Sequence, residues 1–379
     1  MSSGGASWLP AGLRTDLVSH CVRSYRSSQL AVIVQSWPHQ VFRLTSSQAG
    51  AAYDYTEEIG VDVDQRKLEL KMKSELVITA LNKSLLSEDG SNIRVLDITN
   101  FPMTFHFLVK TSASMKSRSQ IRVISDLVVD DQNIFLSLPS ALNFHLQIRH
   151  LHIVCYDRHG VSSRKLSNFL HQLRSCPDIE VSTLEGLQIS RLDLRTAFGV
   201  EKHSSELFDF INEQFPNISS LDLSYNAINL NGDDLATSIL ESFFSKLTKL
   251  KRLNIGGNRL TNKLPDILRG RDLHYLNLTG TQLRQLDVSF LASFPGLNHL
   301  DLSNNKLRNK LNVLQGMLVQ LQLLEILEMI DCELDDECLE EIIQTVKPLA
   351  KLRIINVTNN LILRQDFYIN HDQCKIITE

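Results

Sequence analysis

Few residues of this chain have the types and spacing that catalysis or metal binding requires. His150 and His152 would share one face of a strand, with Cys155 nearby, and imidazole and thiolate are zinc ligands. Two histidines without a carboxylate or a further ligand at metal spacing are more typical of a surface, so we expect no metal site. The sequence has no phosphate-binding G-x-x-x-x-G-K-(S/T), no H-E-x-x-H and no G-x-S-x-G. We therefore expect a protein that is not an enzyme and that needs no cofactor.

Polar and aromatic side chains between regularly spaced leucines are better candidates, because they could hold another macromolecule. In a strand of the form L-x-x-L-x-L the leucines point inward, and the alternate residues face the other way. Arginine and tyrosine in such positions commonly anchor interfaces. The alternative is that L-D-L-S is simply the common sequence of such strands, so that its aspartate indicates no ligand. The candidate binding residues are Arg191, Asp193, Asp222, Arg252, Asn254, Tyr275, Asn277, His299, Asp301, Ile326, Glu328 and Asn356.

These side chains are positioned by a repeated sequence motif, L-x-x-L-x-L-x-x-N-x-L, which we call the phrase. It is nearly complete at Leu297, Leu300, Leu302, Asn305 and Leu307. Good copies begin at residues 218, 250, 273, 297, 324 and 352, and weaker ones at 93, 148 and 189. Most spacings match the period of about 20 to 29 residues that defines a leucine-rich repeat. The sequence therefore predicts an α/β leucine-rich-repeat solenoid, a horseshoe with parallel strands on its concave face and helices on its convex face.

The segments between the strands contain further predictable features. Apolar residues at helical spacing predict helices over residues 233–244 and 335–347. The ninth residue of the phrase should be structural, since an amide can satisfy backbone groups where the chain leaves the strand. These ninth residues are Asn226, Asn258, Asn305 and Asn360, with Thr281 and Cys332 as substitutes.

Residues 1–90 do not follow the repeat, and we expect a helical cap there that covers the open end of the repeat domain at 91–379. The first helix should begin at Pro10, where the missing amide hydrogen does no harm. A second is expected from Leu30 to Trp37, ended by Pro38, and a third from Leu70 to Leu85.

Three motifs in order carry a family resemblance: L-P-x-x-L-x-x-x-L at 9–17, V-x-S-W-P at 34–38 and I-R-V-L-D-I-T at 93–99. The chain resembles the PRAME family (preferentially expressed antigen in melanoma) and its relative leucine-rich-repeat-containing protein 14. The resemblance continues at 121–127 and at 327–339, where the strand ends in C-x-(I/L)-x-D-(D/E). It implies a substrate-recognition subunit of a cullin-2 RING ubiquitin ligase, docked through elongins B and C.

In such a receptor the first helix would carry the docking motifs. The sequence departs from them, because Gly12 stands at an apolar position of the cullin box, and Asp16 and Tyr25 replace a small and an aliphatic residue of the elongin box. One alternative is an amphipathic cap helix packed on Trp37, and another is an interaction scaffold without ligase docking. The docking residues that the resemblance implies are Leu9, Pro10, Leu13, Leu17 and Cys21.

The composition bears on membrane insertion, on the cellular compartment and on the type of partner. The 379 residues are 43% hydrophobic and 22% charged, and no apolar run is long enough to cross a membrane. Six cysteines without a C-x-x-C pair favour a reducing compartment, the cytoplasm or the nucleus or both. Residues 101–175 carry nine lysines and arginines against four aspartates, which either solvate a loop or meet an acidic partner. Residues 176–379 carry an excess of acidic residues, which disfavours nucleic-acid binding.

Overall fold

A computed structural model of the chain describes residues 32–37, 41–46, 95–97, 103–104, 122–130, 142, 144–154, 163–192, 194, 206–230, 234–260, 263–268, 270–283, 285–364, 367 and 374–378. The chain divides into two compact units. Unit 1 comprises Met1–Arg158 and Lys165–Glu185, and unit 2 comprises His159–Arg164 and Gly186–Glu379.

Unit 2 is built on a parallel sheet in which consecutive strands are neighbours. The central residues of the strands pair in one unbroken row, so that Leu221 opposes Leu253, Leu253 opposes Leu276, and Leu276 opposes Leu300. This repetition confirms the predicted solenoid of leucine-rich repeats. The strands are β8 (Gly186–Ser190), β9 (Ser220–Asp222), β10 (Arg252–Asn254), β11 (Tyr275–Asn277), β12 (His299–Asp301), β13 (Ile326–Glu328), β14 (Ile354–Asn356) and β15 (Lys375–Ile377).

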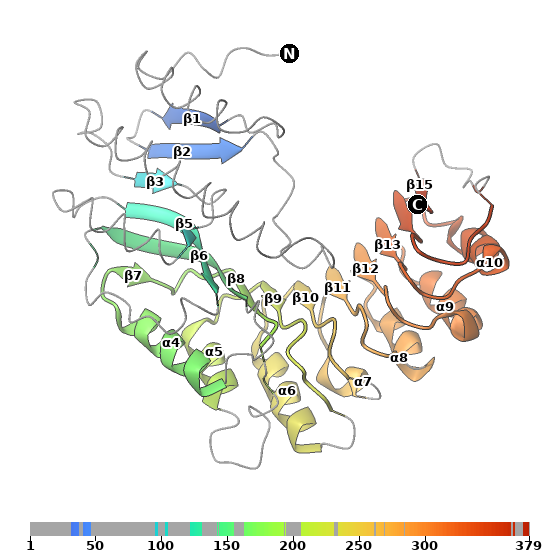
Figure 1. Ribbon diagram of the computed structural model, residues 1–379, viewed down its shortest axis with the longest axis horizontal. Helices are drawn as coiled ribbons and strands as arrows, with labels where there is room; N and C mark the ends of the chain where they lie inside the picture. Colours follow the sequence, from blue (N-terminus) through green and yellow to red (C-terminus); the bar gives the residue numbers. More distant parts are fainter. Residues whose placement is uncertain are drawn as a thin grey trace. The chain divides into compact units, whose positions relative to one another are not determined.

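Helical segments connect the strands of unit 2, and each packs against the next along the chain. They lie together on one side of the strands (Figure 1). The helices predicted over 233–244 and 335–347 are confirmed as α6 (Asp234–Lys246) and α10 (Asp336–Val346). The other segments are α5 (Glu206–Gln214), α7 (Leu264–Ile267), α8 (Gln285–Phe290) continued by η4 (Leu291–Ser293), and η5 (Arg308–Lys310) continued by α9 (Leu311–Leu318).

The core of unit 2 lies between the strands and the helices. Leu253, Leu276 and Leu300 are fully buried, as the inward side of an L-x-x-L-x-L strand requires. On the helix side, Phe243 of α6 lies 4.9 Å from Phe208 of α5, ring centre to ring centre. Each repeat thus buries its apolar face against its neighbours, which is the source of stability in a solenoid.

The turn after each strand is also repeated. The eighth residue of the phrase has a positive φ throughout, from 53° at Asp331 to 67° at Gly257. Two of these eighth residues are glycines, Gly257 and Gly280, for which the left-handed conformation carries no steric penalty. The ninth residue then satisfies the backbone as predicted. Asn258 Nδ2 donates to the carbonyl oxygens of Leu223, Ile255 and Gly256, and the Thr281 hydroxyl donates to Leu278 O at 2.7 Å.

Unit 1 contains mostly parallel strands and one described helix. Strands β1 and β2 pair antiparallel, and parallel pairs link β2 to β3, β3 and β4 to β5, β5 to β6, and β6 to β7. The bounds are β1 (Val32–Trp37), β2 (Val41–Ser46), β3 (Val95–Asp97), β4 (Met103–Thr104), β5 (Arg122–Asp130), β6 (His145–Val154), β7 (Ile179–Glu180) and α4 (Ser163–Ser175), which begins in unit 2.

The helix predicted from Leu30 to Trp37 is wrong, because Val32–Trp37 is strand β1. Val32, Ile33 and Val34 are consecutive β-branched residues, which lose side-chain freedom in a helix and favour a strand. The proline expected to end a helix lies instead in the connection between Trp37 and Val41, which oppose each other in the hairpin. The helices predicted at residues 10–22 and 70–85 fall outside the described residues.

Among the described residues, no helix combines the length and the apolar character needed to span a membrane.

Candidate functional site: the strand face of unit 2

The candidate binding residues from the repeats between Ile218 and Ile362 lie in two rows on the sheet of unit 2. The register opposes Arg252 to Tyr275 and Tyr275 to His299, and it opposes Asn254 to Asn277 in the second row. We call the surface formed by these rows the strand face. The outer row is Ser220, Arg252, Tyr275, His299, Ile326, Ile354 and Lys375. The central row is Gln188, Asp222, Asn254, Asn277, Asp301, Glu328, Asn356 and Ile377.

The placement of Arg191 on this face is wrong, because the repeat is five residues out of register. Gln188 is the residue that opposes Asp222, and sequence reasoning missed it. Ile189, Leu192 and Leu194 imitate the first, fourth and sixth residues of the phrase, but they are its sixth, ninth and eleventh. The missed signal is the full phrase from Leu184, in which leucine replaces the ninth asparagine.

Arg191 instead occupies the turn after β8, with a φ of 59°. Its guanidinium lies over the ring of Tyr225, 5.7 Å from the ring centre, and Tyr225 occupies the same turn position one repeat later. Asp193, which was predicted beside it, lies outside the described residues.

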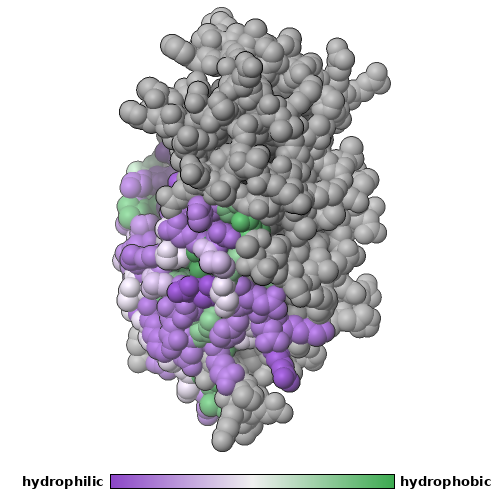
Figure 2. Space-filling view, turned by 90° about the vertical axis from the view of Figure 1, so that its left-hand side faces the viewer, coloured by the Kyte–Doolittle hydropathy of each residue, from purple (hydrophilic) through white to green (hydrophobic). Residues whose placement is uncertain are grey.

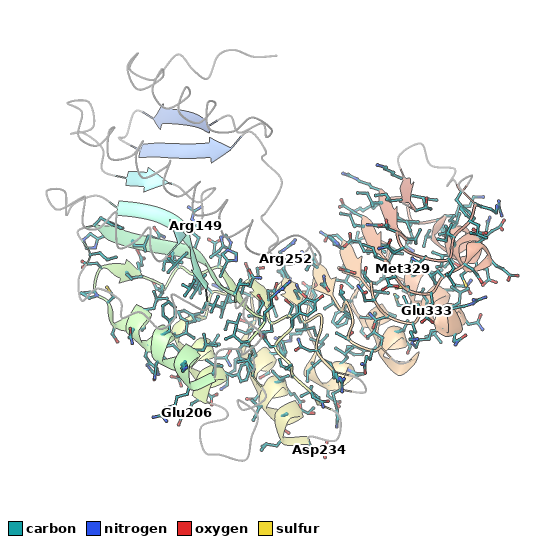
Figure 3. The ribbon with its side chains drawn as sticks, viewed as in Figure 1. Arg149, Glu206, Asp234, Arg252, Met329 and Glu333 are labelled. Carbon is teal, nitrogen blue, oxygen red and sulfur yellow. The ribbon has the colours of Figure 1, made fainter. Side chains whose placement is uncertain are left out.

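A continuous chain of contacts links the outer row to the central row across four strands. The Arg252 guanidinium lies over the Tyr275 ring, 4.3 Å from its centre. The rings of Tyr275 and His299 pack in a T-shaped arrangement, with their centres 4.7 Å apart. His299 Nε2 and Glu328 Oε2 are 3.1 Å apart. Tyr275 is buried while Arg252 is exposed, so the tyrosine supports a guanidinium that faces solvent. Figure 3 shows Arg252 at the strands, whereas Asp234 lies at the start of helix α6.

Two amides of the central row donate to neighbouring carboxylates of the same row. Asn254 Nδ2 donates to Asp222 at 3.0 Å, and Asn277 Nδ2 donates to Asp301 at 2.7 Å. Asp301 also accepts from the Thr279 hydroxyl at 2.8 Å. These bonds fix the side chains, so the row is rigid before any partner arrives.

Asp301 is a buried carboxyl group of the strand face, next to a second carboxyl group. Burial raises the pKa of its carboxyl group, and the negative charge of Glu328, which opposes it in the register, raises that pKa further. Hydrogen bonds from Ser303 and Thr279 act in the other direction. The negative charges of the central row also act on Tyr225. Burial raises the pKa of Tyr225, the charge of Arg191 lowers it, and the charges of Asp301 and Asp222 raise it.

The strand face carries three isoleucines towards its C-terminal end. Ile326 and Ile354 oppose each other in the outer row, which ends at the exposed Lys375, and Ile377 ends the central row; the three isoleucines are half-buried. The face thus presents, from β10 to β15, an exposed arginine, a pair of carboxylates, and isoleucines next to an exposed lysine. Such a surface suits binding of a macromolecule by charge and shape.

The other candidate residues belong to unit 1 or lie outside the described residues. His150 and His152 lie in β6 of unit 1, with ring centres 6.4 Å apart, and Cys155 is outside the described residues. The docking residues Leu9, Pro10, Leu13, Leu17 and Cys21 are also outside them. The side of the described residues drawn in Figure 2 is mostly hydrophilic, with small separate apolar patches.

Comparison with known proteins identifies leucine-rich repeats. A Leucine Rich Repeat family model matches residues 249–270. The chain is 33% identical over 99 residues to acidic leucine-rich nuclear phosphoprotein 32 family member A of Drosophila pseudoobscura pseudoobscura, covering 26% of this chain and 37% of that protein. It is 26% identical over 179 residues to osteomodulin of Bos taurus, covering 47% of this chain and 33% of that protein. The matches thus span about a third of each relative.

Two solved structures share low sequence identity with the chain. An internalin from Listeria monocytogenes is 15% identical with a TM-score of 0.38, over 76% of this chain and 74% of that one. TLR13 in its complex with ssRNA13 is 16% identical with a TM-score of 0.41, over 79% of this chain and 44% of that one.

Proposed function

We propose that this protein is a non-catalytic interaction scaffold that binds a protein partner on the strand face of unit 2. The observation that carries the proposal is the linked series Arg252, Tyr275, His299 and Glu328, which spans four consecutive strands. The leucines on the opposite side of the same strands form the core, so Arg252, His299 and Glu328 lie outside it, and Tyr275 is the buried member of the series. An exposed arginine held by a buried tyrosine is the kind of group that anchors an interface.

Mutation of the strand face tests this proposal. Arg252→Glu and Glu328→Lys should each weaken partner binding by at least about 30-fold, which corresponds to about 2 kcal/mol for a charged group at an interface. Partners would be captured with the tagged full chain from cells and quantified by mass spectrometry. Partners of the strand face are those whose recovery falls with both variants.

Glu241→Arg is the matched control, because Glu241 is an exposed acid on helix α6 on the other side of the repeats. Circular dichroism and thermal unfolding would establish that all three variants fold. Recovery that is unchanged by both strand-face variants and lost with Glu241→Arg would move the binding surface to the helices.

We further propose that the scaffold is the substrate-recognition subunit of a cullin-2 RING ubiquitin ligase, with its target on the strand face. The support is the L-P motif at Leu9 and Pro10 with its resemblance to the PRAME family. In this form of the proposal elongins B and C and cullin-2 bind the N-terminal segment, and the protein works inside the cell, in the cytoplasm or the nucleus. A scaffold without ligase docking remains the alternative.

Co-purification separates these two functions. If the ligase proposal is right, elongin B, elongin C and cullin-2 are recovered with the wild-type chain and lost with the double variant Leu13→Asp, Leu17→Asp. The Glu328→Lys variant should keep the elongins and lose only the target. Failure to recover the elongins with any variant would leave the scaffold and remove the ligase.

A further inference from the structure

The strand face is electrically asymmetric across its strands. Arg252 in β10 is exposed, and among the residues that the structure describes it forms no ion pair. Asp301 on β12 and Glu328 on β13, two and three strands away, oppose each other. One end of the linked series therefore presents a cation and the other end presents two acids.

The acidic end lacks a full counter-charge. The donors to Asp301 within the described part of the chain are neutral groups: the amide of Asn277, the hydroxyl of Thr279 and the backbone N–H of Ser303. Within the described residues the basic group paired with Glu328 is His299, and that imidazole is charged only when protonated. Like charges that face each other on neighbouring strands are destabilising, so a cation placed over this pair would relieve a repulsion already present in the free protein.

The basic end is built in a different way. A guanidinium over an aromatic ring keeps its hydrogen-bond donors available at its edge, where a carboxylate can bind two of them at once. Tyr275 holds Arg252 in this position before a partner arrives, which reduces the entropy lost on binding.

From this arrangement we infer that the partner segment on the strand face carries a basic side chain that binds over Asp301 and Glu328, and an acidic side chain that binds Arg252. The inference rests on the proposed function of the strand face and adds the chemistry of its partner. Strands are about 4.8 Å apart, so three strands separate Arg252 from Glu328 by about 14 Å across the sheet, with about 7 Å more along it. An extended segment covers the resulting distance of about 16 Å in about five residues.

A random twelve-residue peptide library displayed on phage and selected on the full chain tests the inference. Selected peptides should be enriched in lysine or arginine, with an aspartate or glutamate four to six residues away. Synthetic copies should lose at least tenfold in affinity for Asp301→Asn, Glu328→Gln and should bind more weakly at high salt. The single variant Glu328→Gln, which leaves the hydrogen bonds of Asp301 in place, should show part of the same loss.

The matched control is the double variant Glu213→Gln, Glu241→Gln, which removes the same charge from exposed positions of α5 and α6 and should leave the affinity unchanged. Peptides selected on Arg252→Gln should lose the preference for an acidic residue and keep the preference for a basic one. Peptides that need Tyr275 but contain no basic residue would overturn the inference while keeping the strand face as the binding site. Peptides that bind every strand-face variant equally, or a library that yields none, would overturn the proposed function as well.

Discussion

The amide of Asn258 provides a test of how the repeats hold together. Its side chain is 1% exposed. It donates to the carbonyls of Leu223, Ile255 and Gly256, and its oxygen accepts from the backbone N–H groups of Asn226 and Ile228, both at 3.1 Å. One side chain therefore ties the turns of two successive repeats.

The cost of Asn258→Ala follows from the groups left without a partner. Leu223 O keeps its bond from Asn226 Nδ2, and Gly256 O keeps its bond from Tyr225 N–H. The N–H groups of Asn226 and Ile228 and the carbonyl of Ile255 lose the bonds described above. A buried unpaired polar group costs about 1 to 3 kcal/mol, so we expect the free energy of unfolding to fall by about 4 kcal/mol.

The natural repeat at Thr281 supplies the control variant. Its hydroxyl donates to Leu278 O, the carbonyl that corresponds to Ile255 O, so Asn258→Thr should recover about 1 kcal/mol of the loss. Urea unfolding followed by circular dichroism measures the change in midpoint. Hydrogen exchange should show that the amides of Asn226 and Ile228 lose protection in Asn258→Ala. A loss below about 1 kcal/mol with both amides still protected would refute this account of the turn.

Two further changes test the turns and the helix caps. Gly257→Ala should destabilise by about 2 kcal/mol, because a Cβ there would lie 2.3 Å from the Tyr225 ring at a φ of 67°. Gly270→Ala, at a φ of 70° with no atom within 4 Å of the added Cβ, should cost only about 1 kcal/mol. Equal midpoints of thermal unfolding for the two glycine variants would contradict this. Asp335→Ala should cost about 1 kcal/mol at neutral pH through loss of the cap of α10. The hydrogen bond from the N–H of Cys338 lowers the pKa of Asp335, so the stability that the cap provides is present above the ordinary pKa of 3.8 and is lost as the pH falls through the pKa of the folded protein. A difference in stability between Asp335→Ala and the wild type that stays the same in acid would contradict this.

The spacing of the apolar residues was enough to predict the sheet of unit 2 and its helices α6 and α10, because burial on one side of a strand or helix dictates a period that can be read directly. The same rule led to the error at Ile189, since the sixth, ninth and eleventh residues of one phrase can pass for the first, fourth and sixth of another. Strand β15 was missed because Lys375–Ile377 carries no such phrase and follows β14 only through backbone pairing.

The linkage between side chains of the strand face could be predicted only in part. Alternation placed Arg252, Tyr275 and His299 on the same face, but whether neighbouring side chains stack or repel depends on the register between strands. The repeated phrase predicts that register, because these residues occupy the same position in successive copies, but it does not predict the side-chain conformations that decide the contacts. Asp301 and Glu328 likewise share the fifth position of successive copies, whereas the burial and the hydrogen bonds of Asp301 are visible only in the structure.

The opposition of Asp301 and Glu328 separates the part of the strand face that the fold requires from the part that it does not. Asn258 and its equivalents are fully used by the backbone, so their types follow from architecture. Asp301 also serves the backbone, because its carboxylate accepts from Ser303 N–H, as the amide oxygen of Asn277 accepts from Thr279 N–H one repeat earlier. An amide could fill this role without a charge, whereas burial and the charge of Glu328 raise the pKa of Asp301 and make its charged form a cost to the folded state at neutral pH. The fold therefore accounts for an acceptor oxygen at Asp301 but not for two opposed carboxylates, and the second carboxylate is better explained by what it binds than by what it stabilises.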